Sequence, residues 1–169
     1  MNTRIADRQP RAGDVETHAE SPDGSGILAA WSRTPLLIIQ GLVALTAFAG
    51  GAALVVGSVN PDFSLAIVPS SEYLQGSPFD SYVVPGIILA LVLGGVHLVA
   101  FLMLLRRQRW AHFAAAAAGF DALIWIFVQM IYIPFSPLQA VYFLAGMAEL
   151  GFLLLGLGVL RPLPSKQTA

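Results

Sequence analysis

Three ionisable side chains interrupt otherwise apolar stretches of this chain: His97, Asp121 and Glu149. A charge placed in hydrocarbon costs roughly 3 kcal/mol on insertion scales, so intramembrane ionisable residues usually pair with one another or serve a function. A histidine beside two carboxyl groups can bind a proton or a cation. The same set also suits a divalent metal, whose bound water can hydrolyse a substrate.

The depth of these residues predicts that they meet. If each apolar stretch is a helix crossing a membrane, Asp121 and Glu149 lie about 18 Å from the cytoplasmic boundary and His97 about 14 Å, at roughly 1.5 Å per residue. All three are then near the middle of a hydrocarbon core about 30 Å thick. Small residues such as Gly94 and Gly146 share their helix faces, as is typical of helix contacts in lipid. We therefore predict one buried polar cluster.

Two interpretations of this cluster remain open. Two carboxyl groups in a low dielectric cannot both ionise cheaply, which favours a proton-handling or cation-binding site. Alternatively, neutral acids hydrogen-bonded between helices serve only to hold the bundle together. We expect Gln129, Tyr142 and Trp125 at the periphery of the cluster. We expect Gln40 to extend toward the inner interface.

Metal and cofactor chemistry finds little support in the sequence. No HExxH or similar ligand spacing is present. The chain has no Cys, which removes disulfides, thiolate catalysis and Cys-based metal sites. We predict no metal site, no cofactor and no catalytic residue.

The composition is that of a membrane protein. Of 169 residues, 56% are apolar and 11% are charged, and the mean hydropathy is +0.72. A soluble domain has about 25% charged residues. The net charge of −1 offers no basic surface for nucleic acid. The lipid bilayer is thus the expected surrounding of the chain.

Four apolar stretches of about 20 residues each predict an all-α, four-helix transmembrane bundle. Helices are the only plausible form for them, because the backbone must satisfy its own hydrogen bonds in lipid. The expected helices are 35–57, 84–105, 111–133 and 138–160, within a membrane domain over residues 31–161. We expect a disordered cytoplasmic tail over 1–30, an extracytoplasmic loop over 58–83 and a second cytoplasmic tail over 162–169.

The cationic residues predict the orientation. None of the nine lies in 58–83 or in the 134–137 turn. Positively charged loops stay in the cytoplasm, so both termini are expected there. The nine are Arg4, Arg8, Arg11, Arg33, Arg106, Arg107, Arg109, Arg161 and Lys166.

Two stretches resemble those of known proteins. SPFDSYVVPGIILALVLGG, at 77–95, and IWIFVQMIYIPFSPLQAVYFLAGMAELGF, at 124–152, are similar to segments of small uncharacterised four-helix bacterial integral membrane proteins. The resemblance covers about 35–160. It implies the four-helix architecture and a bacterial inner membrane, and it implies no activity.

We expect a non-enzymatic integral membrane protein, an accessory or complex subunit with a buried polar cluster. Its partner would be a second copy or another membrane protein. One alternative is a small proton-coupled or cation-linked transporter, and another is a membrane enzyme. A transporter needs a path to the acids, an enzyme needs a cavity with converging polar groups, and a subunit needs an outward-facing stripe of small residues.

Overall fold

A computed structural model describes residues 28–60, 62 and 68–159 of the chain. Within these residues the fold is all-α, and four helical spans are long and apolar enough to cross a membrane. This confirms the expected all-α class and the four apolar spans. The spans are α1 (Ala30–Val59), Val83–Leu105, α5 (Ala111–Tyr132) and α6 (Pro137–Gly156). The second consists of α3 (Val83–Ile88), the π-helical turn η2 (Leu89–Gly94) and α4 (Gly95–Leu105).

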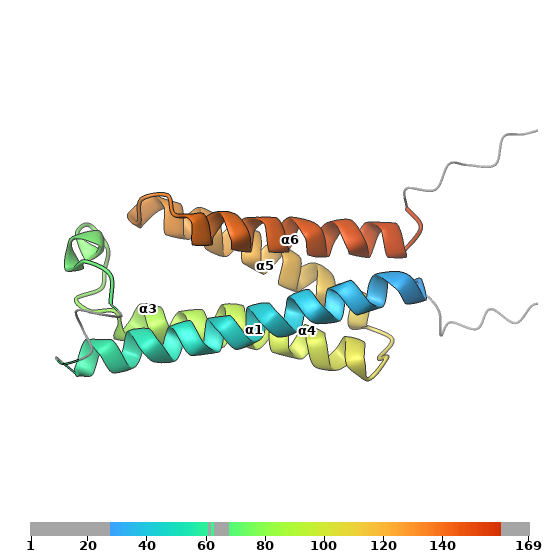
Figure 1. Ribbon diagram of the computed structural model, residues 1–169, viewed down its shortest axis with the longest axis horizontal. Coiled ribbons are helices and arrows are strands. Elements are labelled where there is room, and N and C mark those ends of the chain that lie inside the picture. Colours follow the sequence, from blue (N-terminus) through green and yellow to red (C-terminus); the bar gives the residue numbers. More distant parts are fainter. Residues whose placement is uncertain (1–27, 61, 63–67, 160–169) are drawn as a thin grey trace, which may run out of the picture.

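Each of the four spans packs against two others, so that together they close a ring; Figure 1 shows them side by side along the long axis of the molecule. α1 packs against the second span on one side and against α6 on the other, and α5 packs against α4 and α6. Consecutive spans run antiparallel, as expected for a bundle with short connections. This arrangement brings the inward faces of all four spans to a common interior.

Two pairs of glycines bring the helix backbones into direct contact. A Cβ atom built on Gly51 of α1 would lie 2.5 Å from the Gly86 carbonyl oxygen, and one on Gly86 would lie 2.8 Å from the Gly51 oxygen. A Cβ on Gly146 of α6 would lie 3.0 Å from the Gly119 oxygen of α5. Close approach through small residues is a main source of helix association in lipid. These contacts fix α1 against α3 and α5 against α6.

The outer surface of the bundle is apolar. Leu91, Ile131 and Leu144 are 67%, 74% and 64% exposed, and many other large apolar side chains are exposed with them. Contiguous exposed apolar surface is unusual for a soluble monomer. It is the surface that a membrane-spanning bundle presents to lipid.

The last helix ends earlier than expected, at Gly156 instead of residue 160. Gly158 has φ of 72°, in the left-handed region. Its N–H donates to the Leu155 oxygen, and the Val159 N–H donates to the Leu154 oxygen. This is the Schellman arrangement that ends many helices.

The first helix begins earlier than expected, at Ala30 instead of residue 35, and Pro35 lies within it. Pro35 has no backbone N–H, so one hydrogen bond of the helix is missing there. Side-chain hydrogen bonds from Ser32 and Arg33 stabilise the first turns of α1. The Ser32 hydroxyl donates to the Ala29 oxygen. The Arg33 guanidinium donates to the carbonyl oxygens of Leu104 and Leu105, at 3.2 and 2.9 Å, and so caps α4.

Charge separates to the two ends of the bundle. Among the described residues, the cations lie where α1 begins and α4 turns into α5, and the acids outside the spans lie in the connection between α1 and α3. The cations are Arg33, Arg106, Arg107 and Arg109, and the acids are Asp62, Glu72 and Asp80. We call these the cationic end and the acidic end.

Candidate functional site: a buried polar cluster below an apolar cavity

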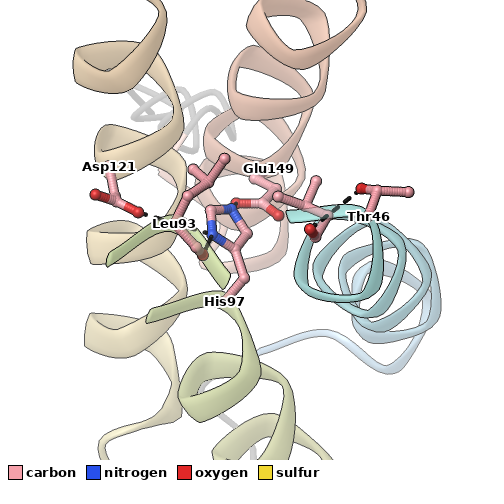
Figure 2. A network of polar contacts seen from close by, with 6 residues as sticks. Thr46, Leu93, His97, Asp121 and Glu149 are labelled. Carbon is pink, nitrogen blue, oxygen red and sulfur yellow. Dashed lines mark hydrogen bonds and ion pairs between the residues drawn. The ribbon is translucent and has the colours of Figure 1, made fainter. Parts of the chain in front are cut away.

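His97 lies at the centre of a polar cluster in the bundle interior (Figure 2). Its Nδ1 atom lies 2.7 Å from the Leu93 carbonyl oxygen and 3.9 Å from Asp121 Oδ2. Its Nε2 atom lies 3.6 Å from Glu149 Oε2. The structure therefore places the three ionisable residues side by side, from α4, α5 and α6.

The contact with Leu93 determines the state of the imidazole ring. A carbonyl oxygen can only accept a hydrogen bond, so Nδ1 carries a proton. Nε2 is left facing Glu149. If Nε2 is bare, the favourable partner is a protonated Glu149, and if Nε2 is protonated, the favourable partner is a Glu149 carboxylate. One proton thus belongs to the pair formed by His97 Nε2 and Glu149.

The cluster is buried but not fully hydrogen-bonded. His97 and Glu149 have fully buried side chains, and the side chain of Asp121 is 17% exposed. The separations of 3.6 and 3.9 Å suit ion pairs but exceed hydrogen-bond length. Buried polar atoms without a hydrogen-bond partner are few in native proteins, and each calls for an explanation. Within the described residues these atoms are Gln40 Nε2 and Oε1, His97 Nε2, Asp121 Oδ2, and both Glu149 oxygens.

All six of these atoms belong to four residues, and each of the four spans contributes one residue. Gln40 is the member that the sequence analysis missed. We expected it to extend toward the interface, but its side chain is fully buried. It shares the inward face of α1 with Leu36, Val43 and Ala47, which are also buried. Their spacing of four, three and four residues is the periodicity that could have revealed Gln40 as an inward residue.

Gln40 lies at the depth of Glu149. α1 and α6 run antiparallel, and the Ser32 side chain fills the space beside Gly156. Gln40 is eight residues beyond Ser32, and Glu149 is seven residues before Gly156. At about 1.5 Å per residue the two side chains leave their helices at nearly the same level. Gln40 is thus a further buried polar residue at the level of the cluster formed by His97, Asp121 and Glu149.

A cavity of about 600 Å³ lies on the acidic side of this cluster. Its lining includes Leu93, Trp125, Thr46 and Tyr142. The Tyr142 hydroxyl donates to Thr46 Oγ1 at 2.7 Å, which joins α6 to α1. Leu93 and Trp125 are each one helical turn from a cluster residue, His97 and Asp121 respectively. This end of the cavity is therefore about one turn above the polar cluster.

The residues predicted at the cluster periphery line the cavity. Trp125, Gln129 and Tyr142 all contribute to its wall. Trp125 and Gln129 follow Asp121 by one and two turns along α5, and Tyr142 precedes Glu149 by two turns along α6. They therefore belong to the space above the cluster.

The segment before α3 covers the acidic end of the cavity. Tyr73 and Leu74 of the short helix η1 (Ser71–Leu74) line it, as does Tyr82. The Tyr82 hydroxyl donates to the Ser70 oxygen at 2.7 Å. Burial raises the pKa of Tyr82, and the neighbouring Tyr73 adds to this effect. Tyr82 therefore remains a neutral donor that holds η1 over the cavity.

The π-helical turn η2 forms part of the cavity wall and directly precedes α4, the helix that contains His97. π-helical turns inside α-helices are rare and are frequent at functional sites. Leu93, whose carbonyl positions His97, is within this turn. No sequence signal used above predicts it, because its residues suit an ordinary apolar helix.

No group of three His, Asp or Glu residues that could hold a metal ion occurs in the part of the chain that the structure describes. Comparison with protein-family models, curated proteins and solved structures gives no match. The class of the protein is therefore given by its fold. The described residues are all-α and contain four apolar spans that are compatible with a multi-pass membrane protein.

Proposed function

We propose that this protein is a proton-linked carrier of a bacterial inner membrane, and that the polar cluster is its proton-binding site. The observation that supports this most is the position of His97 between the buried carboxyl group of Glu149 and the partly buried one of Asp121, below a cavity large enough for a small molecule. Intramembrane acids that face one another mark proton relays in many carriers. The cavity supplies the space that a purely structural cluster would not need.

The charge of the cluster explains why a proton would move there. With one proton shared between His97 and Glu149 and with Asp121 ionised, the cluster carries one net negative charge. One further proton makes it neutral. Because a net charge is costly in a low dielectric, binding and release of this one proton is coupled to any change in solvation of the site. Filling or emptying the cavity one turn away is such a change.

The groups around His97 come from every neighbouring span. α5 contributes Asp121, α6 contributes Glu149, and α1 contributes the neutral amide of Gln40 at the level of Glu149. The residues of His97's own span that line the cavity are apolar or aromatic, except for the Tyr82 hydroxyl just before it. The proton site therefore depends on two carboxyl groups.

The orientation follows from the ends of the bundle. The cationic end would face the cytoplasm and the acidic end, with the cavity, would face outward. Both termini would then be cytoplasmic, and the segment between α1 and α3 would be extracytoplasmic. A molecule would enter the cavity from the outer side.

Infrared difference spectroscopy tests the proton site. The protein in lipid is taken through a pH titration, and the carbonyl band of protonated carboxyl groups is followed. We expect a band that grows and disappears with pH, that Glu149→Gln or Asp121→Asn removes, and that Glu72→Gln at the acidic end leaves intact. A buried carboxyl band that never titrates would instead support a cluster that only holds the helices together.

An accessory subunit is the second candidate, and a different feature favours it. A hollow on the outer face between the second span and α5 is lined by small and apolar residues, which suits a partner helix. It is formed by Leu91, Gly95, Val96, Val99, Ala114 and Ala117.

Cysteine cross-linking tests the second candidate directly, because the chain has no native Cys. Ala117→Cys should form a cross-link if this hollow binds a second copy or another membrane protein. Leu144→Cys, which is exposed on α6, is the matched control. Equal cross-linking at both positions would show that the hollow is not a specific interface.

A further inference from the structure

We infer that the cavity binds a neutral, mainly apolar small molecule that carries an aromatic ring and one hydrogen-bonding group, and that comes from the bilayer. This inference deepens the proposed function, because it names the class of molecule that a proton-linked carrier would bind. It does not require the cluster to titrate, so the two are tested separately.

The lining of the cavity determines the charge of the ligand. Among the residues that the structure describes, its wall consists of apolar, aromatic, hydroxyl and amide side chains, with no Asp, Glu, Lys, Arg or His. A charged ligand would lose its hydration without gaining an ion pair, which is costly. Asp121 and His97 lie one turn away behind Trp125 and Leu93, and the exposed acids Glu72 and Asp80 neighbour the lining residues Tyr73 and Phe79 without forming part of the wall. A neutral ligand is the one that this wall accepts.

The volume determines the size of the ligand. A space of about 600 Å³ lies within the range of roughly 300–1,000 Å³ that is typical of small-molecule sites. Leu54, Ile88 and Leu89 supply apolar wall from α1 and the second span. Burying apolar surface there is favourable by roughly 25 cal/mol per Å². The ligand is therefore mainly apolar and of the size of a drug-like molecule.

The polar and aromatic side chains indicate a ring and a polar group. Trp125, Tyr132 and Tyr142 offer ring faces and edges, against which an aromatic ring packs favourably. Gln129 and Ser77 add an amide and a hydroxyl to the same wall. A few placed polar groups in an apolar pocket commonly fix the orientation of a ligand.

The surroundings indicate the source of the ligand. Most of the wall belongs to the apolar spans, so the cavity is level with the hydrocarbon layer. Thr46 is exposed at the surface of the bundle and still lines the cavity. The bond between Thr46 and Tyr142 therefore lies where the cavity approaches the surface between α1 and α6. A molecule dissolved in the bilayer reaches the cavity along this seam.

Photolabelling in liposomes tests the inference. The probe is 4-(hydroxymethyl)benzophenone, a neutral two-ring ketone with one hydroxyl, which bonds to nearby C–H groups under ultraviolet light. Its matched control is 4-benzoylbenzoate, which has the same rings and a negative charge. Labelled peptides are located by mass spectrometry. Ala53, which lines the cavity, is replaced by Trp to fill it, and the adjacent exposed Ala52 is replaced by Trp as the control variant.

We expect the neutral probe to label residues that line the cavity, Ala53→Trp to reduce this labelling at least fivefold, and Ala52→Trp to leave it unchanged. The anionic probe should label the cavity at least fivefold less in the parent protein, a comparison that needs no variant to fold. Labelling confined to exposed lipid-facing residues, or equal labelling of the cavity by both probes, would overturn the inference. Neither result bears on the proton site, which the infrared titration of the polar cluster tests separately.

Discussion

Replacing Gly51 with Ala should weaken the bundle, because this glycine lies where α1 and α3 touch. The added methyl would lie 2.5 Å from the Gly86 oxygen and 2.8 Å from the Ala90 Cβ. Ordinary contact distances are near 3.5 Å, so the helices must separate by about 1 Å. Overpacking of this kind costs roughly 1–3 kcal/mol. Ala is favoured over Gly in a helix by about 1 kcal/mol, which offsets part of that cost.

The expected net effect is a loss of up to about 2 kcal/mol in the free energy of unfolding. Gly151→Ala is the matched control, because a Cβ on Gly151 meets no atom within 4 Å. The control should gain up to about 1 kcal/mol from helix propensity alone. The assay is unfolding in mixed micelles with increasing dodecyl sulfate, followed by circular dichroism. If Gly51→Ala were as stable as Gly151→Ala, the close crossing of α1 and α3 would be refuted.

Three further predictions concern single contacts and the orientation. Tyr142→Phe removes the hydrogen bond to Thr46 and should lower the free energy of unfolding by about 0.6 kcal/mol, and by no more than about 1.7 kcal/mol. An unchanged midpoint in the same unfolding assay would show that this bond does not hold α6 to α1. Arg107→Gly should stabilise the protein by about 1 kcal/mol, because Arg107 has φ of 52° at the end of α4; a loss of stability would contradict this account of the turn. In intact cells, a membrane-impermeant maleimide should label Glu72→Cys directly and Gln108→Cys only after permeabilisation, and the opposite pattern would invert the proposed topology.

The four spans could be predicted from the sequence because a single strong effect, the apolar character of each run, decides their structure. A run of about 20 apolar residues has few alternatives to a membrane-spanning helix. The ends were less certain, since they depend on local contacts. Arg33 supports the early start of α1 through the carbonyl groups of α4, and Gly158 ends α6 through its left-handed backbone.

The proximity of His97, Asp121 and Glu149 also followed from the sequence, because an acid in an apolar span has a strong reason to turn inward. Gln40 was misplaced because the expected start of the first helix at residue 35 put this amide near the interface, whereas α1 begins at Ala30 and Gln40 lies deeper in the bundle. Its burial depends on how α1 packs against α6. The cavity and the π-helical turn were missed for a similar reason: both arise from the relative placement of whole helices, which local periodicity does not encode.

The central claim is that His97 Nε2 and Glu149 share one proton within the cluster that binds and releases a further one. Nitrogen-15 NMR of histidine-labelled protein in lipid measures this directly, because protonated and bare ring nitrogens resonate far apart. His97→Gln assigns its signals against those of the other histidines. The account predicts that Nδ1 of His97 is protonated, held by the Leu93 oxygen, and that the Nε2 signal shifts when Glu149→Gln removes the carboxyl group that shares its proton. A bare Nδ1, or an Nε2 signal that is indifferent to Glu149→Gln, would contradict it.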